Sequence, residues 1–272
     1  MPESISVSRV SLAVRTLDVW TGRPAASPLL QVRLAGDVRR RPLRSSDGTW
    51  IFMDVTSETC VVSVVSDVYL PCEREVNLAS LPAGNPVIDI YLLPGRRYSA
   101  PPAATGLMRR LTDEKGGALA GVKVNAYADD ERCARGRLLD EEVLPGSAEL
   151  RPLPSGPALM NGDLLAIRSK ENPEAEWFRV QPCELDAKPC LRLDRPLAGR
   201  WKRHALLLPG AETISDADGW IVLPFRGRML GAGKLRVCLR NGKETVEAEW
   251  PMEEGKVLSL PPFLWPSNKS EK

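Results

Sequence analysis

Short runs of alternating apolar and polar residues follow one another along the whole chain of 272 residues. Residues 10–15 and 30–34 alternate in this way, an apolar run lies at 60–65, and residues 87–93 are apolar except for Asp89. An alternation with a period of two predicts strands that bury one face, and Asp47-Gly48 predicts a hairpin turn between two of them. No segment carries the long 3.6-residue apolar periodicity of an amphipathic helix, so the pattern predicts an all-β fold.

The same order of signals returns in the second half of the chain, where residues 122–127 alternate and Asp216-Ala-Asp-Gly219 follows much later. Each Asp-Gly pair precedes an apolar run that contains a tryptophan. We therefore expect two repeated domains with Trp50 and Trp220 at matching buried positions. The remaining strands of the second copy are expected at 107–111, 235–239 and 257–260.

An insertion interrupts the second copy. About 12 residues separate the alternating strand from the Asp-Gly turn in the first copy, and almost 90 do so in the second. The simplest explanation is an inserted unit at 131–212, whose short strands could close into a small barrel. Glu131–Glu142 is a candidate short helix within it. Its candidate strands lie at 161–167, 176–180, 190–194 and 205–208.

These signals predict the domain organisation of the chain. The segments are a first sandwich at 1–98, a linker at 99–105, a second sandwich made from 106–130 and 213–266, the inserted subdomain at 131–212, and a tail at 267–272.

Charge and composition narrow the classes of partner. The net charge of +2 gives no electrostatic reason to expect nucleic acid or an anionic membrane. No run of about 18 apolar residues is present, and the first residues lack the pattern of a secretory signal, so we expect a cytoplasmic protein without membrane insertion. Its cysteines should then be reduced and mostly buried. They are Cys60, Cys72, Cys133, Cys183, Cys190 and Cys238.

The residue constellations of common catalytic and metal sites are missing. His204 is the only histidine, and no Gly-x-Ser-x-Gly motif is present. Residues 227–234 have one residue too many for a phosphate-binding loop, and Asp216–Gly219 lacks the later ligands of a calcium loop. Cys183 and Cys190 could form a hairpin disulfide or half of a metal site, or remain two buried thiols. We expect no catalytic residue, no cofactor and no metal.

Binding to other proteins is the remaining class of function. The basic clusters at 39–41 and 200–203 are typical of solvated loops or protein-binding rims, with nucleic-acid contact as the alternative. The apolar segment 261–266 lies between prolines and cannot form a core alone, so it should dock onto its own domains or onto a neighbour. The expected partner-binding residues are Phe263, Leu264, Trp265 and Trp201.

Both repeated copies resemble the carboxypeptidase regulatory-like, or prealbumin-like, domain. The resemblance rests on Thr21–Ala25 and Asp47–Val55 in the first copy, and on Gly117–Val124 and Ser215–Trp220 in the second. It covers about two-thirds of the chain and implies two β-sandwiches, the second interrupted by a small β-barrel-like insertion.

The insertion resembles small barrels of phage-tail and tail-like particle proteins, through Gly162–Leu165, Phe178–Val180 and Leu193–Leu197. Prealbumin-like proteins are also similar to accessory products of contractile injection systems. These resemblances imply a non-catalytic structural or adaptor subunit whose partners are other protein subunits or further copies of the chain. The alternative is a carbohydrate- or cell-surface-binding module with an exposed aromatic such as Trp177 or Trp201.

Overall fold

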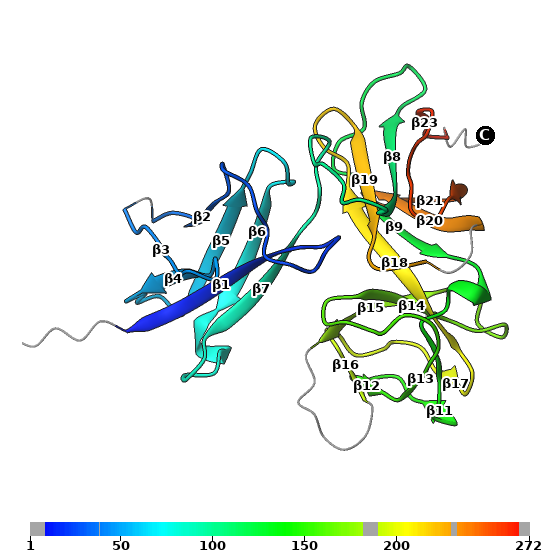
Figure 1. The fold of residues 1–272 in the computed structure, drawn as a ribbon, viewed down its shortest axis with the longest axis horizontal. Helices are drawn as coiled ribbons and strands as arrows, with labels where there is room; N and C mark the ends of the chain where they lie inside the picture. Colours follow the sequence, from blue (N-terminus) through cyan, green and yellow to red (C-terminus); the bar gives the residue numbers. More distant parts are fainter. Residues whose placement is uncertain (1–8, 38, 182–189, 230–232, 267–272) are drawn as a thin grey trace, which may run out of the picture. The chain divides into compact units, whose positions relative to one another are not determined.

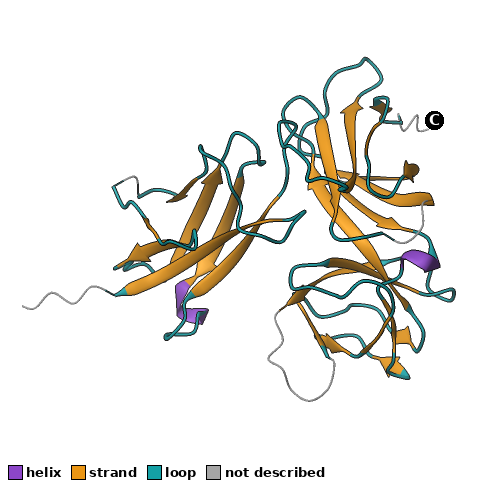
Figure 2. Cartoon of the chain, viewed as in Figure 1, coloured by secondary structure: helices purple, strands orange, loops and turns teal. Residues whose placement is uncertain are grey.

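The computed structural model describes residues 9–37, 39–181, 190–229 and 233–266. The predicted all-β fold is confirmed: strands dominate the described residues, whose two helices are single 3-10 turns (Figure 2). The chain divides into two compact units, with the boundary between Tyr98 and Ser99, and residues 20–22 belong to the second unit.

The first unit packs two sheets around one core. The first sheet has the order β3 (Leu43–Arg44), β4 (Trp50–Met53), β1 (Val10–Asp18), β7 (Val87–Leu92). The second has the order β2 (Gln31–Leu34), β5 (Thr59–Val65), β6 (Cys72–Asn77), followed by the 3-10 turn η1 (Leu78–Ser80). All neighbouring strands are antiparallel except β1 and β7, which are parallel. Alternate residues of each strand, such as Leu12, Val14 and Phe52, fill the space between the sheets.

A buried carboxylate ties the end of β1 to the later part of this unit. Asp18 is 4% exposed and accepts hydrogen bonds from the hydroxyls of Tyr69, at 2.8 Å, and Tyr98. Burial, together with these bonds to Asp18, raises the pKa of both tyrosines. The two phenols therefore stay protonated donors well above the pH at which an exposed tyrosine ionises.

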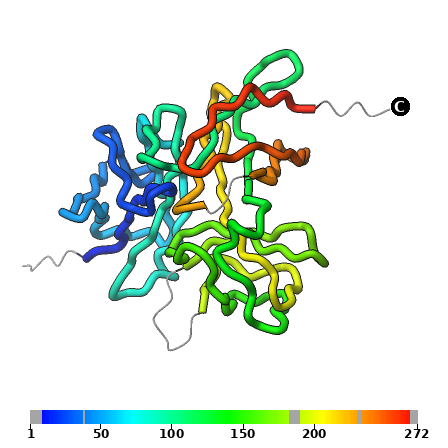
Figure 3. Tube along the Cα trace, turned by 45° about the vertical axis from the view of Figure 1, so that its right-hand side comes forward, coloured from blue at the N-terminus to red at the C-terminus, as the bar shows by residue number. Residues whose placement is uncertain are grey.

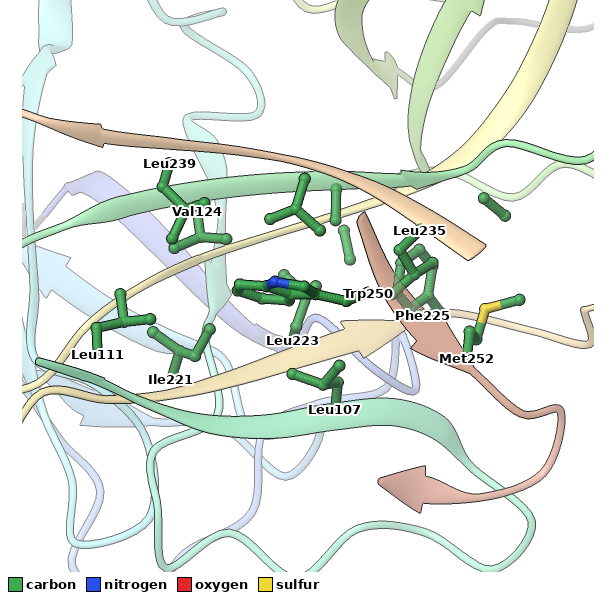
Figure 4. Packing of buried hydrophobic residues seen from close by; sticks show 14 of the residues in the cluster. Leu107, Leu111, Val124, Ile221, Leu223, Phe225, Leu235, Leu239, Trp250 and Met252 are labelled. Carbon is green, nitrogen blue, oxygen red and sulfur yellow. The ribbon is translucent and has the colours of Figure 1, made fainter. Parts of the chain in front are cut away.

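The second unit contains a sandwich with the same strand pairing. In one sheet, β8 (Thr105–Thr112) pairs antiparallel with β19 (Trp220–Phe225) and parallel with β22 (Val257–Ser259) and β23 (Phe263–Leu264). The opposite sheet has the order β18 (Leu206–Ile214), β9 (Lys123–Ala128), β20 (Gly233–Asn241), β21 (Glu244–Met252). Strand β8 thus has the neighbours that β1 has in the first unit (Figure 1). Trp250, Leu223 and Leu235 lie in the core between these sheets (Figure 4).

The residues between β9 and the end of β18 form further strands, which lie together in one part of the second unit (Figures 1 and 3). These strands have a core of their own. Leu138, Phe178 and Trp201 are among its fully buried side chains. Strand β18 runs through both parts, pairing with β10 and β14 at its start and with β9 at its end. The elements are η2 (Glu131–Cys133), β10 (Gly136–Leu138), β11 (Glu142–Val143), β12 (Glu149–Leu150), β13 (Pro152–Pro154), β14 (Leu164–Arg168), β15 (Glu176–Gln181), β16 (Leu191–Leu193) and β17 (Trp201–Lys202).

Two arginines connect this inserted region to the second sandwich through hydrogen bonds and an ion pair. Arg226, just after β19, donates to the carbonyl of Asn161 at 2.6 Å and lies 3.3 Å from the carboxylate of Asp163. Arg135 donates to the carbonyl of Arg226 at 2.9 Å. Burial raises the pKa of Asp163, although both arginines oppose that shift. The insertion and the sandwich belong to one compact unit, and an independently folding subdomain at 131–212 stays a prediction.

Two local expectations are corrected. The candidate helix Glu131–Glu142 is a single 3-10 turn, and from Gly136 the chain continues as β10, paired on both sides with β13 and β18. The cysteines are less buried than expected: of the described five, only Cys133 is buried. Cys183 lies outside the described residues.

The expected equivalence of Trp50 and Trp220 is wrong by one residue. The turns at Ser45–Thr49 and Asp216–Trp220 each close with two backbone hydrogen bonds, one between the first and fifth residues and one between the fourth and first. These bonds define which residues of the two turns match. Because side chains alternate along a strand, an offset of one residue changes the face. Trp50 packs half-buried against its core, whereas Ile221 takes that place in the second unit and Trp220 points to the other face of β19. The matching pairs are Ser45 with Asp216, Gly48 with Gly219, Thr49 with Trp220, and Trp50 with Ile221.

Candidate functional site

An open groove of about 650 Å³ lies on the outer face of the sheet β18-β9-β20-β21. Its floor consists of side chains that point away from the core, because Leu235, Val237 and Leu239 of β20 point inward. The segment 173–177, at the start of β15, forms the wall. The cross-strand rows of this sheet face are Tyr127–Arg236–Glu249, Asn125–Cys238–Glu247 and Lys123–Arg240–Thr245.

The wall residue Trp177 is held in one orientation by two neighbours. Its indole lies over Gly210 of β18, where an added Cβ would come within 2.9 Å of the ring. The ring of Tyr127, which pairs with Gly210 across the sheet, meets the indole edge-on at a centroid distance of 5.6 Å. Glycine at 210 therefore makes room for the indole, and the half-buried Trp177 presents its remaining surface to the groove.

The charges of the floor are partly paired. Arg236 donates to Asp129 at 2.9 Å, and Lys234 donates to Glu249 at the same distance, which lowers the pKa of Glu249. The side chains of Arg240 and Glu247 are exposed and make no hydrogen bond or ion pair within the described residues. The floor of the groove thus offers one guanidinium and one carboxylate that are ready to bind a ligand.

Trp201 was expected at a partner surface and is instead buried. It is 1% exposed and packs in the core of the insertion. Its indole N–H donates to Glu176 Oε2 at 3.0 Å, and the same carboxylate oxygen accepts from the backbone of Gly199 at 3.0 Å. The expectation that Trp201 is exposed is therefore wrong, and in this structure its side chain is not presented to a protein or a glycan.

The segment Phe263–Trp265 docks onto its own domain. Strand β23 pairs with β8, and the ring of Phe263 packs against Trp250 at a centroid distance of 5.8 Å. Trp265 is 8% exposed and donates its indole N–H to Glu244 at 3.0 Å. Of the three expected partner-binding residues in this segment, Leu264 is 62% exposed, Phe263 is half-buried and Trp265 is buried.

An apolar row crosses the outer face of the four-stranded sheet in the first unit. Leu43 pairs with Ile51, Ile51 with Ala13, and Ala13 with Val87, so that each of the four strands contributes one residue. Leu43 is 61% exposed, Ile51 and Val87 are half-buried, and Ala13 is buried, at 8%. The next row along β1 holds the Arg15–Asp89 ion pair, at 2.6 Å. We call Leu43, Ile51, Ala13 and Val87 the apolar row.

The other expected features lie in ordinary turns and loops. His204 is exposed in a turn, and its backbone has a positive φ of 70°. The Asp216 carboxylate accepts from the backbone N–H groups of Asp218 and Trp220, as expected for a turn rather than a calcium loop. In the basic cluster at 200–203, Arg200 and Lys202 pair with glutamates. The described residues contain no group of three or more His, Cys, Asp or Glu side chains arranged to hold a metal ion.

Comparisons with known proteins do not place the chain in a family. No family model matches it, and no curated protein matches it. A streptococcal ancillary pilin, among the solved structures, aligns at 9% identity over 94% of this chain and 99% of the other, with a TM-score of 0.15. That score carries no argument about fold or function. Neither of the two helices in the described part of the chain is long enough to span a membrane.

Proposed function

We propose that the chain is a non-catalytic structural or adaptor subunit of a larger protein assembly, with a contractile, phage-tail-like particle as the specific setting. It is made in the cytoplasm and joins other subunits there. Its two sandwiches are prealbumin-like domains, the second interrupted by the insertion. This proposal on the fold is supported by the shared strand pairing around β1 and β8 and by the sequence resemblance of both copies.

The apolar row carries the proposal. Its four side chains lie side by side on strands that are paired into one sheet, so they form a rigid, flat surface. A sheet face with one exposed and two half-buried aliphatic side chains, bordered by the Arg15–Asp89 ion pair, has the apolar centre and polar rim of a protein interface. Burying Leu43 against a partner would contribute roughly 1.5 kcal/mol, because most of its side chain is in water in the isolated chain.

Leu43→Asp tests the proposal, with Leu29→Asp as the matched control. Both leucines belong to the first unit and are about equally exposed, at 61% and 58%, but Leu29 is not part of the apolar row. We expect Leu43→Asp to release the chain from its native complex, as measured by affinity purification from cells, without a change in melting temperature. Leu29→Asp should leave the complex intact. Unchanged co-purification of Leu43→Asp would reject the apolar row as the interface.

Carbohydrate binding is the second candidate function. Of the two aromatic residues expected to support it, Trp201 is buried, but Trp177 lines the groove of the second unit. The groove and the apolar row are on different units, so the two functions can be tested separately.

A further inference from the structure

The floor of the groove restricts how a ligand can be recognised. Strand β9 is paired on one side with β18 and on the other with β20, and β20 is paired with β9 and β21. The backbone N–H and C=O groups of these strands are therefore used within the sheet. A peptide cannot add itself as a strand over β9 or β20, because strand addition requires a free edge, which in this part of the sheet belongs to β21. A ligand that lies on the floor over β9 and β20 must therefore be recognised by side chains.

The indole of Trp177 provides an apolar platform. Gly210 and Tyr127 hold it from one side, so it loses little conformational freedom when a ligand stacks on it. The face of an aromatic ring is electron-rich and favours C–H groups that carry a partial positive charge. The C–H face of a pyranose ring has this character, and it is flat enough to stack on an indole.

Arg240 and Glu247 provide the polar contacts. They lie on adjacent strands, since Arg240 pairs with Thr245 and Cys238 pairs with Glu247. The guanidinium is a fork of donors and the carboxylate accepts two or more hydrogen bonds. Hydroxyl groups on neighbouring carbons of a sugar both donate and accept, so they can satisfy both side chains at once. A ligand with donors only, or with acceptors only, would leave one of them unsatisfied.

The overall charge of the lining argues against an anionic ligand. Two arginines, Arg236 and Arg240, face three glutamates, Glu174, Glu247 and Glu249, so the lining has a slight negative excess. A phosphate or sulfate group near Arg240 would be repelled by Glu247. The volume of about 650 Å³ falls within the roughly 300–1,000 Å³ of small-ligand sites.

We propose that this groove binds a neutral oligosaccharide, with one sugar ring stacked on Trp177 and the hydroxyls of a neighbouring ring bonded to Arg240 and Glu247. The inference gives the second candidate function its site and its class of ligand, and it does not depend on the assembly role of the apolar row.

Titration of the full chain with cellohexaose, maltohexaose and chitohexaose tests the proposal, with a heparin hexasaccharide as the anionic probe. We expect saturable binding of at least one neutral probe by calorimetry, accompanied by a change in tryptophan fluorescence. Arg240→Gln and Glu247→Gln should each weaken this binding at least tenfold. Neither side chain has a partner to lose within the described residues, so both variants should fold like the parent. Trp177→Ala should abolish binding, and Trp220→Ala, on the opposite sheet, should not.

Each contrary result has a definite meaning. Absence of binding by all three neutral probes at millimolar concentration would overturn the proposal. Binding that persists in both Arg240→Gln and Glu247→Gln would place the sugar outside the groove and also overturn it. Binding of the heparin probe alone would reject a neutral ligand. Co-purification of these variants with the native complex should remain normal, which separates a failure of this inference from a failure of the assembly role.

Discussion

Replacing Trp201 tests whether this residue stabilises the insertion or binds a partner. Its side chain is 1% exposed, and truncating a buried tryptophan to alanine costs roughly 3–5 kcal/mol in the free energy of unfolding. The change also removes the indole N–H from Glu176, but that carboxylate keeps the backbone N–H of Gly199, so its further cost is small. We expect Trp201→Ala to destabilise the insertion by about 4 kcal/mol.

Trp201→Phe separates packing from hydrogen bonding. Phenylalanine keeps most of the buried apolar surface and loses only the bond to Glu176, which still accepts from Gly199, so the cost should be about 0.5–1.5 kcal/mol. Denaturant unfolding followed by far-ultraviolet circular dichroism measures both variants. Leu144→Ala, at a half-exposed leucine of the same region, serves as the control and should change stability by less than about 0.5 kcal/mol.

A stabilising role for Trp201 is refuted if the free energy of unfolding of Trp201→Ala lies within about 1 kcal/mol of that of the parent. Loss of the native complex at unchanged stability would then mean that Trp201 is exposed to a partner, as the sequence alone suggested.

Three further perturbations have defined outcomes. Deleting residues 261–272 should lower the melting temperature of the second unit by several degrees in calorimetry, because β23 and a buried indole are lost; an unchanged melting temperature would contradict this. The raised pKa values of Tyr69 and Tyr98 stabilise the first unit fully below pH 10, and this stability should fall as pH rises above 10, where tyrosines of the unfolded chain ionise. Denaturation between pH 8 and 11 measures the slope, which Asp18→Asn should reduce. Replacing residues 135–208 by a short Gly/Ser loop should leave a second sandwich that still unfolds cooperatively, because it keeps its own core. Loss of its β-sheet signal in circular dichroism would contradict this.

Alternation of apolar and polar residues was sufficient to predict most strands that bury a full face. It did not reveal β21, whose outward glutamates and Pro251 are typical of a loop. Proline is tolerated there because β21 lies at a sheet edge, where its missing N–H costs no hydrogen bond. Strand β6 was missed for a related reason: only Val76 of its six residues is buried.

The groove could not be predicted from the sequence, because hairpin register and a tertiary contact create it. The pairing of Cys238 with Glu247 brings the polar sides of β20 and β21 together, and Trp177 reaches the floor only through the fold of the insertion. The one available signal was the alternation of Arg236, Cys238 and Arg240 with buried aliphatic residues. Trp201 was expected at the surface because it lies in a charged segment, but the side chains of Arg200 and Lys202 point away from the core that buries the indole.

The chain returns from the insertion through β18, and this changes which strands have a free edge that another chain could pair with. Among the described residues, no strand pairs with the outer edge of β2 in the first unit, whereas its counterpart β9 is covered by β18. A free edge is a template for intermolecular pairing and for aggregation, and covering it removes that hazard. Of these two equivalent strands, only β2 is therefore open to strand-to-strand contact with another chain, and Gln31 and Arg33 are its exposed residues.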